Sequence, residues 1–251
     1  MVRLETLKER YVIYCQINTL TALHIGKGRG EKELGEADLP ILKLPDGTPY
    51  IPGSSLKGII RSHFERIVTG LGIRVCIYQK SQPPIIPDYE CEPENPCISC
   101  ELFGSKNMSS RVIVRDSYPR EKVEGIIRKG IALNRDTKTV SPRRSPFDIE
   151  FVPPGTKFDL EIVIENPEKW MLGALFATLE DISSIGGQVS RGMGKVKIEI
   201  IKIESWTPDS IVKQRPANIF SDEALKKFIE ETKKTFNESI HLLKDRYGGS
   251  Q

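Results

Sequence analysis

Four stretches of the chain alternate between apolar and polar residues, the pattern of strands that bury one face. These stretches are 11–18, 111–116, 158–165 and 195–204. In the first, Ile13 and Ile17 lie on the same side as Tyr11. In the last, the adjacent Ile200 and Ile201 interrupt the alternation and predict a β-bulge. The pattern therefore predicts four strands.

The stretch 54–68 has the period of an amphipathic helix. Pro52 and Gly53 end the segment before it, and the side chain of Ser54 or Ser55 is expected to cap its first turn. The apolar face comprises Leu56, Ile59, Ile60, His63, Phe64 and Ile67. The other face is charged, so the helix is expected to bury one side and expose the other.

Two further helices are predicted nearer the C-terminus. Asn166 and Pro167 form a cap and first-position pair that opens the earlier helix. Its apolar face comprises Leu172, Leu175, Phe176, Leu179 and Ile182. The later helix spans about 221–247, with Phe228 and Phe236 facing inward.

The order of these elements predicts an α+β protein with a ferredoxin-like (RRM-like) βαββαβ core. Residues 71–110 and 117–154 show little periodicity and are interpreted as long insertions. We expect a first domain over 1–205 and a C-terminal helical extension over 206–251. The loop 21–49 has a length that is usually functional or mobile.

The predicted sheet is a poor surface for nucleic acid. The aromatic residues on which many sheets of this shape stack RNA bases are missing. Asp159, Glu161 and Glu165 on the polar face of the third strand would repel phosphates. If nucleic acid binds, we expect it along the loops and the first helix.

The amino-acid composition excludes few classes of protein. The net charge of the 251 residues is +3, which is too small to argue for nucleic acid by itself. No apolar run approaches the roughly 18 residues of a membrane span, and the N-terminus is charged rather than signal-like. The expectation is a soluble cytoplasmic protein.

The cysteines indicate a metal site in a reducing compartment rather than a disulfide framework, because their number is odd and three are close together. Cys91, Cys97 and Cys100 include a pair at the spacing that zinc favours. Cys76 is the natural fourth ligand, and His63 is the alternative. A structural zinc ion would explain how an insertion poor in apolar residues holds its shape.

Two segments suit a ribose-phosphate chain. At the first helix start, Ser54 and Ser55, the exposed amides and the cations Lys57 and Arg61 are expected to converge on a phosphate. The alternative is a well-capped surface helix with solvated cations.

The second segment, 186–195, is rich in glycine and lies between a helix and a strand, which is the reverse of the order in a nucleotide-binding P-loop. It also lacks the nucleophile elbow. The candidate RNA contacts that remain are Gly187, Ser190, Arg191 and Lys195. The alternative is a turn that needs glycine for positive φ.

Three motifs, in this order, resemble a known family. They are Gly53-Ser54-Ser55-Leu56-Lys57-Gly58 followed by Arg61, Cys97-x2-Cys100-Glu101-Leu102-Phe103-Gly104, and Ser190-Arg191-Gly192-x-Gly194-Lys195. Over about 11–204, the chain resembles the RAMP superfamily of CRISPR-associated proteins, most closely the repeated backbone subunit of type III (Csm-type) interference complexes.

The resemblance implies CRISPR RNA binding in antiviral defence, with several copies of this chain or its paralogues stacked helically along the guide beside other effector subunits. A β-hairpin "thumb" that kinks the guide–target duplex would lie in 117–154, with Arg135, Arg143 and Arg144 as candidate contacts. By the same analogy, Asp38 supports cleavage of the target RNA with Mg²⁺ or another divalent ion. An inactive paralogue that binds without cutting is left open.

Two other functions remain alternatives. One is a stand-alone RAMP endoribonuclease that processes the CRISPR precursor RNA, for which His24 is the plausible catalytic histidine. The other is a zinc-stabilised RNA-binding module outside any complex. The backbone subunit is favoured because Gly-Ser-Ser-Leu-Lys-Gly and the cysteine cluster are typical of it.

Overall fold

The computed structural model describes residues 6–27, 37–76, 91, 93–130 and 147–247. The strands are β1 Arg10–Thr19, β2 Val112–Val114, β3 Tyr118–Pro119, β4 Ile126–Gly130, β5 Phe147–Phe151, β6 Lys157–Glu165, β7 Val196–Trp206 and β8 Asn218–Phe220. The helices are α1 Gly53–Gly70, α2 Ile98–Phe103, α3 Lys169–Asp181, α4 Pro208–Val212 and α5 Asp222–Tyr247, with a 3₁₀ turn at Val189–Arg191. None of the described helices is long and apolar enough to cross a membrane.

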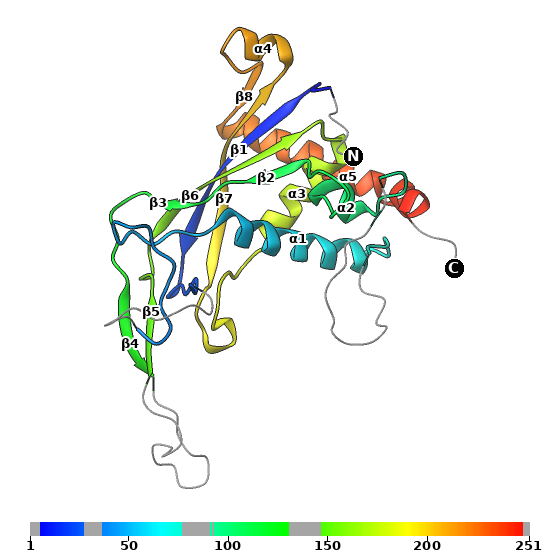
Figure 1. The fold of residues 1–251 in the computed structure, drawn as a ribbon. Helices are drawn as coiled ribbons and strands as arrows, with labels where there is room; N and C mark the ends of the chain where they lie inside the picture. The colour runs from blue at the N-terminus through cyan, green and yellow to red at the C-terminus, as the bar shows by residue number, and fades with distance from the viewer. Residues whose placement is uncertain (1–5, 28–36, 77–90, 92, 131–146, 248–251) are drawn as a thin grey trace.

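One antiparallel sheet organises the molecule, and its strands run in the order β2-β6-β1-β7-β8, with β3 also pairing with β6 (Figure 1). The four predicted strands correspond to β1, β2, β6 and β7. The predicted bulge is confirmed, because Tyr14 pairs with Lys202 and Cys15 with Ile200, which leaves Ile201 as the extra residue.

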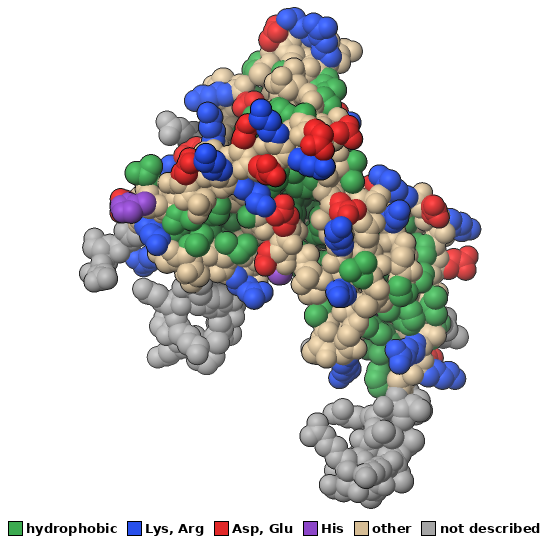
Figure 2. Space-filling view, turned by 180° about the vertical axis from the view of Figure 1, so that it is seen from behind, with side chains coloured by type: hydrophobic (Ala, Val, Ile, Leu, Met, Phe, Trp, Pro, Cys, Tyr) green, Lys and Arg blue, Asp and Glu red, His purple; other side chains and the backbone are tan. Residues whose placement is uncertain are grey.

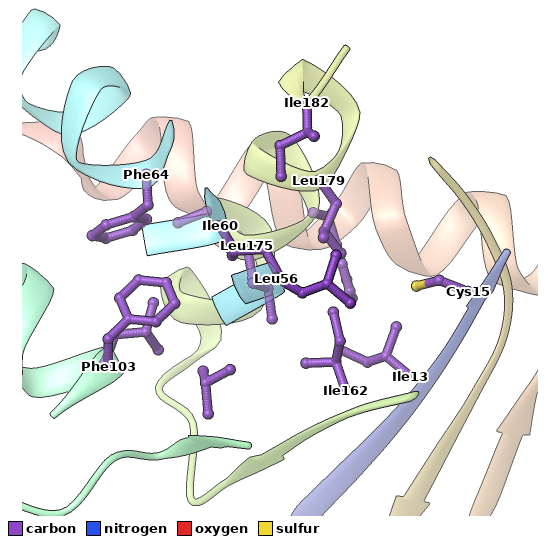
Figure 3. Close-up of a cluster of buried hydrophobic side chains, with 14 of the residues drawn as sticks. Ile13, Cys15, Leu56, Ile60, Phe64, Phe103, Ile162, Leu175, Leu179 and Ile182 are labelled. Carbon is purple, nitrogen blue, oxygen red and sulfur yellow. The ribbon is translucent and has the colours of Figure 1, made fainter. Parts of the chain in front are cut away.

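The core lies between this sheet and the helices (Figure 3). Leu56, Ile60 and Phe64 from α1 meet Ile13 of β1, together with side chains of α3 and β6. The long helix α5 packs along α3 so closely that a methyl group added at Gly173 would overlap the carbonyl of residue 232. The C-terminal helix therefore shares the core of the rest of the chain.

The predicted caps of two helices are wrong. Helix α1 begins at Gly53 after Pro52, and no side chain of its own caps it; instead the Gly53 amide donates to Oδ1 of Asp116 at 2.7 Å. Helix α3 begins two residues later than expected, because Asn166 has a φ of 47° and its side chain accepts from the amides of residues 8 and 9. In both places the residues at the helix start bond with a segment far away in the chain, namely Asp116 for α1 and residues 8 and 9 for α3.

The insertions contain regular structure that periodicity does not mark. Residues 117–154 hold β3 and an antiparallel hairpin of β4 and β5, and a hairpin in this segment is what the resemblance implied. The short helix α2 lies within 71–110. Strand β4 is exposed along almost its whole length, so it has no buried face and none of the alternation that a half-buried strand shows.

Candidate nucleic-acid interface and metal centre

The base of the β4–β5 hairpin is joined to the segment that leads from β1 to α1. Leu23 exchanges two backbone hydrogen bonds with Val152, at 2.9 and 2.7 Å. The Leu39 amide donates to the carbonyl of Asp148, and the Glu150 amide donates to the carbonyl of Leu39. The described parts of the predicted long loop are thus held against strand β5.

Asp38 lies on this junction. Its side chain is exposed, and its Oδ2 accepts from the backbone amide of Asp148 at 2.9 Å. The carboxylate therefore has a fixed place beside the first residues of β5. No pairing with β5 could be read from the sequence around Asp38, because Asp148 lies more than a hundred residues away.

His24 links the glycine-rich segment 186–195 to strand β5. The Gly187 amide donates to the carbonyl of His24 at 2.8 Å, and Nδ1 of His24 lies 2.8 Å from the carbonyl oxygen of Glu150. Positive φ angles occur at Gly186, Gln188, Gly192 and Gly194, as the turn interpretation predicted. The candidate contacts Gly187, Ser190, Arg191 and Lys195 are all exposed.

At the start of α1, Ser54 and Ser55 are exposed and Lys57 is half-buried. Among the described residues, no hydrogen bond or ion pair partner is found for the ammonium group of Lys57. Burial, and then repulsion from Arg61, hold the pKa of Lys57 below its ordinary value. A phosphate beside Lys57 would offset that repulsion.

Arg61 points toward helix α2. Its guanidinium donates to Oε1 of Glu65 at 2.8 Å, to the carbonyl of Gly104 at 2.9 Å and to Sγ of Cys100 at 3.4 Å. A phosphate bound by both Lys57 and Arg61 would therefore have to compete with these three hydrogen bonds of the Arg61 guanidinium.

The hairpin itself exposes both cationic and apolar side chains. Arg128 and Lys129 of β4 are exposed, as are Ile126 and Ile127 at 47% and 55%. Green side chains accordingly cover the hairpin at the lower right of Figure 2. The remaining predicted contacts there, Arg135, Arg143 and Arg144, lie outside the described residues.

The open face of the sheet carries paired charges of both signs. Arg120 contacts Asp159 at 2.5 Å, and Lys202 contacts Glu204 at 2.8 Å. Among the described residues of this face, these cations are paired with carboxylates, which disfavours the binding of a phosphate chain there. The path of RNA along the loops stays a prediction.

Four cysteines form a compact cluster. The sulfur atoms of Cys76, Cys91, Cys97 and Cys100 all lie within 4.8 Å of one another. In a tetrahedral site with zinc–sulfur bonds of about 2.3 Å, sulfur atoms lie about 3.8 Å apart. The cluster therefore fits a metal ion such as zinc.

The other candidate ligands are accounted for elsewhere. His63, the alternative fourth ligand, has its Nδ1 2.8 Å from Oδ2 of Asp181. The fifth cysteine, Cys15, is buried in the core, and burial raises the pKa of its thiol to about 12. Cys76 is thus the fourth member of the cluster.

Helix α2 presents its N-terminus to the cluster. Cys97 is its N-cap, and the sulfur accepts from the Cys100 amide at 3.4 Å. Hydrogen bonds from Cys100 and Cys76 hold the pKa of the Cys97 thiol far below its ordinary value. Thiolates are the form in which cysteines bind metals, so this local structure favours metal binding.

A buried carboxylate near the hairpin base was not among the predicted site residues. Glu150 is 5% exposed, forms an ion pair with Lys43 and accepts from the Ile41 amide at 3.3 Å. No local signal marks it, because its partners lie more than a hundred residues earlier.

The chain is similar in sequence to proteins of one known family. The family model of the RAMP superfamily matches residues 16–197. A protein of Methanothermobacter thermautotrophicus named CRISPR system Cms endoribonuclease Csm3 is 31% identical over 257 residues, which covers 86% of this chain and 91% of that protein. Proteins of the same name from Methanocaldococcus jannaschii and Enterococcus italicus are 31% and 28% identical, and 79% and 77% of this chain is covered.

Proposed function

Because the chain belongs to the RAMP superfamily and to the Csm3 proteins within it, we propose that it is a CRISPR RNA-binding backbone subunit of a type III effector complex that cleaves target RNA. The relatives are named as endoribonucleases. One structural observation carries the proposal. The exposed aspartate, the glycine-rich loop and an exposed hairpin are joined at one place by hydrogen bonds across β5.

The core is proposed to be ferredoxin-like. The order β1, α1, β2, β6, α3, β7 along the chain and β2-β6-β1-β7 across the sheet supports this assignment. The insertions would then carry the functional parts, namely the metal centre and the hairpin, while the sheet fixes their separation.

The guide RNA is proposed to run along the loops rather than across the sheet. Its phosphates would meet Ser54, Ser55 and Lys57 at the start of α1, and Gly187, Ser190, Arg191 and Lys195 in the glycine-rich loop. Arg135, Arg143 and Arg144 between β4 and β5 would meet the guide–target duplex. Other copies of the chain and further effector subunits would bind along the same RNA.

Asp38 is proposed as the catalytic residue. A carboxylate fixed on β5 can orient the attacking ribose 2′-hydroxyl in line with the scissile phosphate. Among the described residues, Asp38 belongs to no group of three or more potential metal ligands. Mg²⁺, when bound, would neutralise charge on the phosphate, with RNA oxygens supplying the remaining ligands.

The cysteine cluster is proposed to hold a structural zinc ion. Four thiolates close the coordination shell, so such a site serves folding rather than chemistry. It would fix α2 and the segment around it against α1.

No observation favours the stand-alone processing enzyme. His24, its expected catalytic residue, is buried at 7% exposure, and its ring nitrogen Nδ1 lies against the carbonyl of Glu150. A histidine held in this way joins the glycine-rich loop to β5.

Guide binding tests the proposed RNA path. We expect Lys57→Ala and Arg191→Ala each to weaken binding equally for all guide sequences, because each removes a phosphate contact. The slope of log Kd against log salt should fall by about 1 for each variant. Lys227→Ala on the exposed face of α5 is the control and should change neither quantity. Unchanged guide affinity in both loop variants would contradict the path.

Arg61 allows a second test, which separates metal support from RNA contact. We expect Arg61→Gln to lower the zinc affinity about tenfold in competition with a chromogenic chelator, since it removes a cation that donates to Cys100. Lys57→Gln, one turn earlier on α1, should leave zinc affinity unchanged. If Arg61→Gln keeps its zinc and weakens guide binding instead, Arg61 contacts RNA, as the sequence analysis predicted.

A further inference from the structure

Glu150 occupies the point where three functional segments meet. Its backbone carbonyl lies against His24, which leads to the glycine-rich loop, and its backbone amide donates to Leu39. Its carboxylate forms an ion pair with Lys43 and accepts from the amide of Ile41. Glu150 thus contacts the segment that follows Asp38 with its backbone, at Leu39, and with its side chain, at Ile41 and Lys43.

The burial of this carboxylate needs an explanation. The Glu150 side chain is only 6% exposed, while that of Lys43 is 35% exposed. Burying a carboxylate is costly unless it is paired and hydrogen-bonded. The ion pair with Lys43 offsets part of this cost, and the buried hydrogen bond to the Ile41 amide is the contact that holds the backbone. That bond fixes backbone three residues from Asp38.

The neighbouring strand leaves room for this carboxylate. An added methyl group at Gly125, just before β4, would lie 2.8 Å from Cδ of Glu150 and closer still to its Oε1. The hairpin base is therefore shaped around the Glu150 side chain.

We propose that Glu150 is a positioning residue for the cleavage reaction: it holds the 39–43 segment against β5, so that Asp38 keeps a constant place relative to the hairpin and the glycine-rich loop. This inference rests on the proposed function. The hairpin and Asp38 then form one rigid unit. An RNA duplex bound by the hairpin would therefore place its scissile phosphate at a constant position relative to the Asp38 carboxylate.

The experiment uses the assembled complex with its guide RNA and a complementary target RNA. We expect Glu150→Ala to lower the single-turnover cleavage rate at saturating target about 10²-fold, the size of effect that a displaced catalytic group produces. Guide and target affinities should not change. Glu150→Gln keeps an oxygen for the Ile41 amide and should restore the rate to within a few-fold of wild type, since it loses only a partly exposed ion pair.

Two further variants control for simple loss of structure. Glu124→Ala removes an exposed carboxylate beside the same hairpin and should cleave normally. Gly125→Ala should reproduce the Glu150→Ala defect by displacing the carboxylate while every charge is retained. It also supplies the test if Glu150→Ala does not fold.

Amide hydrogen exchange gives a readout that does not depend on activity. Exchange at Ile41 should accelerate in Glu150→Ala and stay slow in Glu150→Gln. Normal cleavage in both Glu150→Ala and Gly125→Ala, or equal losses in Glu150→Ala and Glu150→Gln, would overturn the proposal. If the wild-type complex cuts no target, the proposed function fails, and the exchange rates alone decide whether Glu150 holds the segment.

Discussion

Asp38→Ala is expected to abolish cleavage of a target RNA complementary to the bound guide, while the guide and the target still bind. The side chain is exposed beside β5, and its Oδ2 accepts from the backbone amide of Asp148. The catalytic cost of Asp38→Ala is large, because it removes the carboxylate that is proposed to orient the 2′-hydroxyl.

Asp38→Asn is the sharper form of this experiment. The amide oxygen can still accept from the Asp148 amide, so the local structure is kept and only the negative charge is lost. We expect no cleavage from Asp38→Asn either, measured as cut target in a single-turnover assay with Mg²⁺. Cleavage at the wild-type rate in both variants would show that Asp38 is not the catalytic residue.

Loss of the metal is expected to have the largest effect on stability. Cys76, Cys91, Cys97 and Cys100 meet at one point, so a bound metal would tie together positions up to 24 residues apart in the chain. A ligand present at about a thousand times its dissociation constant stabilises a fold by about 4 kcal/mol. For a chain of this size, that corresponds to a fall in melting temperature of about 10 °C when zinc is removed by a chelator.

Cys97→Ser tests the same site without a chelator. This residue is both a cluster member and the N-cap of α2, and a serine can still cap the helix, so Cys97→Ser should remove the metal while the helix start is kept. Cys15→Ala is the control: its thiol is buried in the core, so the metal content should not change even though the core is disturbed. A wild-type zinc content well below one ion per chain would contradict the metal assignment.

The strands of the core could be predicted from the sequence more completely than the contacts of the site. Strands β1, β6 and β7 were predicted within two residues at each end, because burial of one face imposes alternation on the residues themselves. The bulge at Ile201 was predicted for the same reason. The spacing of Cys97 and Cys100 indicated the cysteine cluster, since both residues belong to one short helical turn.

The features that the sequence did not reveal depend on partners far away in the chain or on exposed residues that show no periodicity. The cap of α1 is the carboxylate of Asp116, 63 residues beyond Gly53, and no local pattern marks such a partner. The phosphate contact of Arg61 stays a prediction, but its own helix offers no clue to the hydrogen bond that it donates to Cys100. Strand β4 left no periodic signal, since both of its faces are exposed, and only the resemblance implied a hairpin in this segment.

The sequence by itself thus determined the elements of the core, the family and the types of residue that carry the chemistry. Only the tertiary structure decided which of those residues meet. Periodicity is a local consequence of burial, whereas the contacts of Asp38, His24 and Glu150 are made between segments more than a hundred residues apart. Such contacts exist only after β5 has docked on the 39–43 segment, and that docking assembles the candidate site.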